Sequence, residues 1–111
     1  GSGTPRREFL WADDLADACI FLMKNYSGDV HLNIGQGRDV TIREFSEMIA
    51  AVVGFKGNLE FDATRPDGSP QKLLDVSRLT ALGWTAPTCL KDGLEKYYGW
   101  YLENEHVLRE R

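Results

Sequence analysis

Residues 41–54 read Thr-Ile-Arg-Glu-Phe-Ser-Glu-Met-Ile-Ala-Ala-Val-Val-Gly, and this stretch sets the class of the fold. Thr41 followed by Glu44 fits a capping box, in which the two side chains accept hydrogen bonds from backbone amides. Leaving these amides without a partner would cost about 1 kcal/mol. The stretch therefore predicts a helix, ended by Gly54 or Gly57. Apolar residues at helical spacing predict its buried face: Ile42, Phe45, Ile49, Val52 and Val53.

Upstream of this helix, the sequence predicts one strand and one earlier helix. Residues 30–34 alternate between apolar and polar side chains, as a strand does, and Gly35-Gln36-Gly37 breaks the pattern. The earlier helix starts after Asp13 or Asp14, either of which can cap it. Its apolar residues form one stripe at spacings of three and four: Leu15, Ala18, Cys19, Leu22 and Met23.

Downstream, short elements alternate with loops. Residues 58–62 are a second strand candidate, and the two prolines and the glycine of residues 66–72 predict a rigid loop. Ser77 is expected to cap a short helix closed by Gly83, and Thr88 to cap a last helix that carries an aromatic stripe. Residues 103–111 are expected to fray. Helices with two or three short strands predict an α+β domain, and so thin a sheet suggests a piece of something larger.

Composition narrows the class of protein. The net charge of −4 argues against nucleic acid as a partner, because phosphate binding needs a concentrated basic face. No apolar run is long enough to cross a membrane, and no signal segment opens the chain. Cys19 and Cys89 are interpreted as buried free thiols, in preference to a disulfide or a zinc site. We expect a cytoplasmic protein with no nucleic-acid or membrane partner.

The motifs of several enzyme classes are missing. Gly35-Gln36-Gly37 supplies only the first half of a dinucleotide-binding fingerprint, and no Tyr is followed four residues later by Lys. The nucleophile elbow, the zinc-protease motif and the P-loop are also absent. His31 and His106 stand alone and are interpreted as structural or solvated. The sequence thus contains no catalytic constellation and no metal-ligand set.

Two basic segments have the character of anion-binding sites. Arg6 and Arg7 follow a flexible Gly-Ser-Gly stretch, and an Arg fork can bind phosphate at two points, although an ion pair with Glu8 explains Arg7 equally well. In the rigid loop, Lys72 offers a point charge for phosphate, and Asp67 offers an acceptor for a hydroxyl group. The residues alone predict an anion site of unknown ligand.

Several of these motifs together resemble a known family. The Arg7-Glu8-Phe9 run with Asp13-Asp14, together with Asn33-Ile34-Gly35 and Leu82-Gly83-Trp84, is similar to the C-terminal substrate domain of extended short-chain dehydrogenases that act on nucleotide sugars. Two stretches are more specific. Residues 1–9 and 61–75 resemble the GDP-L-fucose synthases, which epimerise GDP-4-keto-6-deoxy-D-mannose at C3 and C5 and reduce C4 with NADPH.

The resemblance implies that substrate binding and catalysis lie in different domains of the parent protein, and that this chain is the substrate-binding one. Residues 1–111 would be the C-terminal substrate-binding domain, with Arg7 on the GDP-sugar diphosphate and Asp67 and Lys72 lining the site. The NADP-binding Rossmann domain of the α/β parent, with the catalytic residues, would lie upstream. The fragment alone would then be inactive and bind no cofactor.

The resemblance also implies partners and leaves alternatives open. The expected partners are a GDP-sugar, the chain's own Rossmann domain and, for the full-length enzyme, a second copy in a homodimer. One alternative is the equivalent domain of another nucleotide-sugar epimerase, dehydratase or reductase. The other is a stand-alone nucleotide-sugar binding module.

Overall fold

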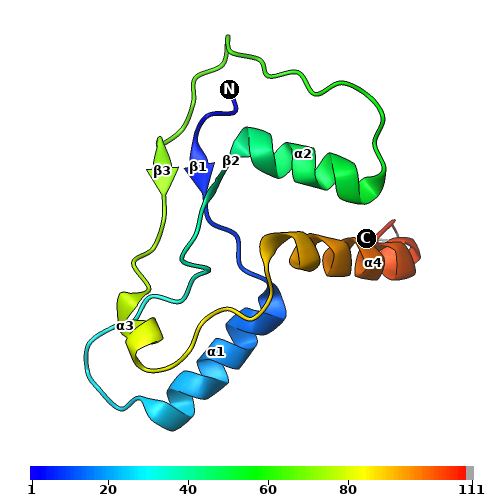
Figure 1. The fold of residues 1–111 in the computed structure, drawn as a ribbon. Coiled ribbons are helices and arrows are strands. Elements are labelled where there is room, and N and C mark those ends of the chain that lie inside the picture. The colour runs from blue at the N-terminus through cyan, green and yellow to red at the C-terminus, as the bar shows by residue number, and fades with distance from the viewer. Residues whose placement is uncertain (110–111) are drawn as a thin grey trace.

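The fold is a small mixed sheet from which helices extend (Figure 1). A computed structural model describes residues 1–109. Its elements follow one another in the order β1 (Arg6–Arg7), α1 (Ala12–Asn25), β2 (Val40–Thr41), α2 (Ile42–Val53), β3 (Gln71–Lys72), α3 (Ser77–Ala81) and α4 (Leu90–Arg109). This arrangement confirms the α+β prediction.

β1 is the central strand of the sheet, whose order is β2-β1-β3. It runs antiparallel to β2 and parallel to β3, with Arg6 opposite Gln71 and Arg7 opposite Lys72. Each strand has only two residues, and hydrogen bonds from the flanking backbone lengthen the ladder. The Arg6 amide donates to the Pro70 carbonyl at 2.8 Å, and the Ile42 amide donates to the Pro5 carbonyl at 2.9 Å.

Both predicted strands are wrong, and in the first of them side-chain bonds rather than a ladder hold the backbone. Residues 30–34 and 58–62 form no strand. The Val30 carbonyl accepts from the Tyr26 hydroxyl at 2.6 Å, and the His31 carbonyl accepts from the Arg78 guanidinium at 2.8 Å. The alternating pattern therefore did not mark a strand. The strands that pair with β1 are β2 and β3 instead.

The capping box predicted for α2 is confirmed. The Glu44 amide donates to the Thr41 hydroxyl at 3.0 Å, and the Thr41 amide donates to the Glu44 carboxylate at 2.8 Å. The bond from the Thr41 amide, and after it a bond from the Thr41 hydroxyl at 3.1 Å, lower the pKa of the Glu44 carboxyl. Gly54 ends the helix in the left-handed region, at a φ of 73°.

The N-caps predicted for α1 and α3 are wrong. Trp11 occupies the N-cap of α1, while the buried carboxylate of Asp14 accepts from the amide and the hydroxyl of Thr88, both at 2.9 Å. Val76 occupies the N-cap of α3 in place of Ser77. Asp14 and Thr88 thus serve a long-range contact, and Ser77 lies one position after the cap.

α4 is longer than predicted. Residues 103–109 continue its helix, so the expectation that this tail frays is wrong there, and residues 110–111 lie outside the described part. α4 packs beside α2 (Figure 1).

The core within residues 1–109 is small. Its buried apolar side chains are Ala18, Leu79 and Trp84, with the Trp84 indole donating to the Asp17 carboxylate at 2.8 Å. The predicted packing of Trp84 behind Gly83 is therefore confirmed. Much of the predicted apolar stripe of α1 is exposed, with Met23 at 83%, and none of the predicted apolar face of α2 is fully buried.

The two cysteines correct another expectation. Cys19 and Cys89 are free, as predicted, but both are exposed in the described structure. The stripes that carry them are apolar, yet nothing within residues 1–109 covers them. Helical spacing identified an apolar face without saying whether a neighbour buries it.

Candidate functional site

The β1–β3 pairing brings together two basic residues that are 65 positions apart in sequence. Arg7 and Lys72 are register partners on parallel neighbouring strands. Because successive side chains of a strand point to opposite faces, this pair lies on one face and the Arg6–Gln71 pair on the other. The sheet thus separates the two arginines that the sequence presented as one site.

Arg6 already has an acidic partner. Its Nε donates to Asp39 Oδ1 at 2.8 Å, and its Nη2 donates to the Asp39 carbonyl at 3.2 Å. Hydrogen bonds from Gln71 and then from Arg6 lower the pKa of the Asp39 carboxyl, so this group stays ionised. The Arg6 charge is neutralised locally, and the predicted two-arginine site is reduced to Arg7.

Arg7 makes no ion pair within residues 1–109. It is half-buried, and its Nη1 donates to the Arg6 carbonyl at 2.6 Å. The Glu8 carboxylate, the partner expected by the alternative interpretation, instead accepts from the amides of Gly37 at 2.6 Å and Leu74 at 3.3 Å. A positioned guanidinium without a neutralising acid is the form that an anion site requires.

Arg7 lines a cleft of about 350 Å³ that also includes Asp67. Both oxygens of Asp67 accept bonds from Ser2, Oδ1 from its amide at 2.8 Å and Oδ2 from its hydroxyl at 2.6 Å. These bonds, the hydroxyl's first, lower the pKa of the Asp67 carboxyl. Asp67 thus ties the 66–72 loop to the start of the chain, while Lys72, exposed on β3, lies outside the cleft lining.

An aromatic side chain forms another wall of this cleft. The Phe61 ring lies against Gly3, where a Cβ atom would approach the ring to 2.5 Å, and Gly3 has a φ of 80°. The Arg43 guanidinium lies over the Phe61 ring, 4.0 Å from its centroid. The segment expected to be a strand therefore contributes a wall of the cleft instead.

The Gly35-Gln36-Gly37 turn does not fit a dinucleotide pyrophosphate. The Glu8 carboxylate caps the Gly37 amide at 2.6 Å and fills the space where a side chain on Gly35 would lie. A phosphate approaching this turn would meet a carboxylate rather than free amides.

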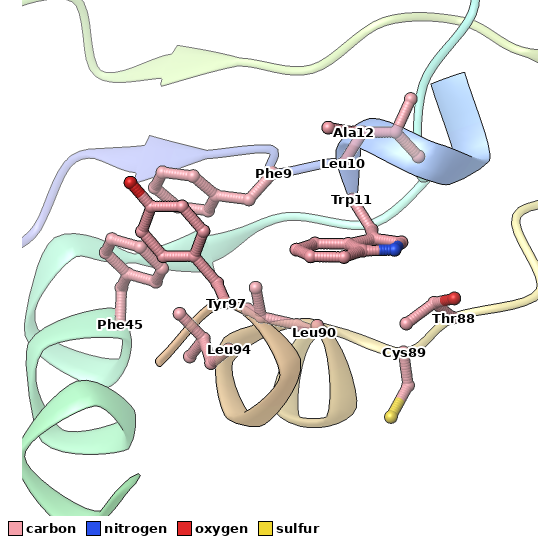
Figure 2. A pocket seen from close by; sticks show the side chains of 11 residues that line it. Phe9, Leu10, Trp11, Ala12, Phe45, Thr88, Cys89, Leu90, Leu94 and Tyr97 are labelled. Carbon is pink, nitrogen blue, oxygen red and sulfur yellow. The ribbon is translucent and has the colours of Figure 1, made fainter. Parts of the chain in front are cut away.

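A second hollow, of about 250 Å³, is apolar (Figure 2). Phe9, Trp11, Phe45, Leu94 and Tyr97 surround it, and the Phe9 and Phe45 rings stack with centroids 3.8 Å apart. The Cys89 sulfur points away from the rings in Figure 2. With so few polar groups, this hollow has the character of a packing surface rather than a reaction site.

Other kinds of site are missing from the part of the chain that the structure covers. Among residues 1–109, no three His, Cys, Asp or Glu side chains are grouped so that they could hold a metal ion. No described helix combines the length and apolarity that a membrane crossing demands.

The sequence did not indicate the role of three polar residues that organise the site. Ser2 binds Asp67, Glu8 binds two loop amides, and Asp39 binds Arg6. Each acts across more than 25 positions of sequence, so no local spacing marked its role. The only available signal was the location of Ser2 and Glu8 within the stretch on which the family resemblance rests.

Known proteins resemble this chain in sequence and structure. The profile of the NAD dependent epimerase/dehydratase family matches residues 1–35. GDP-L-fucose synthase 1 of Arabidopsis thaliana is 58% identical over 94% of the chain and 32% of its own length. The chain therefore spans about a third of such relatives.

Solved structures show the same fold. A GDP-6-OMe-4-keto-L-xylo-heptose reductase from C. jejuni superposes with a TM-score of 0.86 and 40% identity, over 94% of this chain and 33% of that one. A GDP-L-fucose synthetase from Naegleria fowleri bound to NADP gives a TM-score of 0.88 and 27% identity, over 96% of this chain and 34% of that one.

Proposed function

We propose, since the chain belongs to the NAD dependent epimerase/dehydratase family, that it is the GDP-sugar-binding region of a GDP-L-fucose synthase. The parent enzyme would convert GDP-4-keto-6-deoxy-D-mannose to GDP-L-fucose by epimerisation at C3 and C5 and NADPH-dependent reduction at C4. The observation that carries the proposal is Arg7, held at the cleft with no acidic partner among residues 1–109 and in register with Lys72.

The charges around the cleft suit a diphosphate. Arg7 offers a planar fork of N–H donors, and Lys72 adds a second positive charge on the same face of the sheet. Asp39 neutralises Arg6, so Arg6 does not compete with Arg7 for the ligand. Loop amides occupy Glu8, so Glu8 does not compete with the ligand for Arg7. Asp67 lines the cleft and would contact the sugar or hold the loop against it.

The proposed role of the chain is positional. Binding energy from the GDP moiety, remote from the reacting carbons, would orient the ketosugar for chemistry performed elsewhere. The relative from Naegleria fowleri has NADP bound, and the hydride in the proposed reduction would come from this cofactor. Within residues 1–109, the only half-fingerprint for a dinucleotide is capped by Glu8, so we assign NADP and the catalytic groups to an N-terminal Rossmann domain.

The shape of the chain supports a missing partner domain. Its radius of gyration is 16.8 Å, whereas a compact domain of about 100 residues has a value of about 13 Å. Large apolar side chains of α1 and α4, such as Met23, Tyr97 and Trp100, are exposed. These faces would be covered by the rest of the enzyme and, in part, by a second subunit of a homodimer.

Two alternatives to this function were expected, and a solved structure gives the first of them a specific basis. The C. jejuni structure is a reductase of a different GDP-sugar, so the parent could act on another ketosugar with the same nucleotide. A stand-alone nucleotide-sugar binding module would use the same cleft but would need its apolar faces covered in some other way.

Turnover by the full-length protein separates these functions. Oxidation of NADPH that depends on GDP-4-keto-6-deoxymannose, with GDP-L-fucose as the product, is the expected result. Activity confined to another GDP-ketosugar would replace the proposed substrate, and activity confined to a UDP- or dTDP-sugar would overturn the proposal.

A further inference from the structure

Asp39 joins all three strands from the face opposite Arg7 and Lys72. Its Oδ1 accepts from Arg6 Nε at 2.8 Å, and its Oδ2 accepts from Gln71 Nε2 at 2.5 Å. The residue directly precedes β2, and its side chain is only 8% exposed. One carboxylate at the start of β2 thus holds a side chain of β1 and a side chain of β3.

The two residues that Asp39 holds are themselves register partners. Arg6 pairs with Gln71, and the next pair along the two strands is Arg7 with Lys72. A slip of one residue between β1 and β3 would carry Lys72 to the face occupied by Arg6. The clamp on one face of the sheet therefore determines which side chains meet on the other.

The strands have little else to fix this register. β1 and β3 contain two residues each, and the Arg6 amide donates to the Pro70 carbonyl at their junction. Register is weakly specified in short, exposed strands, and β3 is exposed on both residues. A charge-assisted bond donated to a nearly buried carboxylate is among the stronger constraints available at this position.

We propose that Asp39 is a positioning residue of the anion site, which keeps Arg7 and Lys72 side by side without touching the ligand. This inference rests on the proposed function for the identity of the anion, a nucleoside diphosphate. The clamp itself stands on the bonds of Asp39 to Arg6 and Gln71.

The test uses the full-length protein and the variant Asp39→Asn, with Asp17→Asn as the matched control. Asp17 also accepts a 2.8 Å bond from a distant side chain, the Trp84 indole, but lies on α1 outside the sheet. Gln71→Leu provides a milder second variant, because it removes the β3 arm and leaves the Arg6–Asp39 ion pair in place.

Hydrogen exchange of the Arg6 amide, which bonds to the Pro70 carbonyl beside β3, reports on the clamp without any ligand. We expect this amide to exchange faster in Asp39→Asn and in Gln71→Leu than in the wild type and in Asp17→Asn. Unchanged exchange in both sheet variants would overturn the clamp.

Binding of GDP, measured by calorimetry, connects the clamp with the site. Asp39→Asn should raise the Kd by about two- to fivefold, no more than the loss of Lys72 itself, and Asp17→Asn should leave it unchanged. In a Lys72→Ala background the same substitution should raise the Kd for GDP less than about twofold, because the clamp acts through Lys72. Equal losses in both backgrounds, or an equal loss in the Asp17 control, would overturn the positioning role.

Turnover should show the split of a binding defect, with KM raised and kcat little changed in Asp39→Asn. A wild-type protein that binds no GDP would refute the proposed function and, with it, the link to a diphosphate. The exchange measurement would still decide whether Asp39 holds the two strands in register.

Discussion

Replacing Arg7 with alanine in the full-length protein removes the group on which the proposed site depends. The guanidinium is half-buried and already oriented by its bond to the Arg6 carbonyl at 2.6 Å. No acid within residues 1–109 has to release it before an anion can bind. Little of its interaction with a phosphate should therefore be lost to reorganisation.

The magnitude follows from the kind of bond that is lost. Hydrogen bonds to charged groups contribute about 1.5–3 kcal/mol, so Arg7→Ala should weaken GDP binding by about 10- to 150-fold. The cost to folding should be smaller, about 1 kcal/mol, because the structure shows one backbone bond from this side chain. Calorimetric titration with GDP, beside a urea unfolding curve of the same sample, separates the two effects.

Lys24→Ala is the matched control, because it removes one positive charge at the last turn of α1, away from the sheet. We expect its affinity for GDP to equal that of the wild type. If Arg7→Ala also binds GDP within a factor of two of the wild type, the assignment of Arg7 to a diphosphate is refuted.

Three further outcomes are expected. Lys72→Ala should raise the Kd for GDP only about two- to fivefold in titrations, and less at high salt, because Lys72 is an exposed point charge. Asp67→Asn should destabilise the protein at neutral pH; since the folded pKa of Asp67 is lowered, urea curves should show the difference from wild type shrinking as the pH falls below about 4. Asp14→Ala should cost about 1–3 kcal/mol of unfolding free energy in the same assay, because it leaves the buried Thr88 amide without a partner; a loss under about 0.5 kcal/mol would contradict that role for Asp14.

Local chemistry in the sequence predicted the boundaries of α2 well. The capping box of Thr41 and Glu44 and the left-handed Gly54 required only residues within one helix, and both are confirmed. The α+β class also followed from alternating helical and extended patterns. The two ends of α2 are decided by hydrogen bonds between near neighbours, which spacing along the chain can reveal.

Long-range partners were beyond the reach of the pattern. Residues 30–34 have the alternation of a strand, yet their carbonyls are held by Tyr26 and Arg78. Asp14 was interpreted as a cap and instead binds Thr88, 74 positions away. Such contacts depend on how the elements meet, and no feature of the local sequence records that.

The sequence indicated the residues of the candidate site but not how they are arranged. Sequence alone indicated Arg7, Asp67 and Lys72 as candidate binding residues, and their assignment to a GDP-sugar remains a prediction that rests on the family resemblance. The structure adds that Arg7 and Lys72 are register partners and that Ser2 occupies both oxygens of Asp67. A one-dimensional pattern could not distinguish Arg6 from Arg7, because the distinction is which face of the sheet each side chain takes.

A structure of the full-length protein with GDP bound is the decisive test of the proposed site. We expect the diphosphate in the cleft of Arg7 and Asp67, with its oxygens within hydrogen-bonding distance of the Arg7 guanidinium and the Lys72 ammonium group on the same side of the sheet. A diphosphate bound elsewhere, with the Arg7 guanidinium free of it, would contradict the role of Arg7 as the anchor of the GDP-sugar.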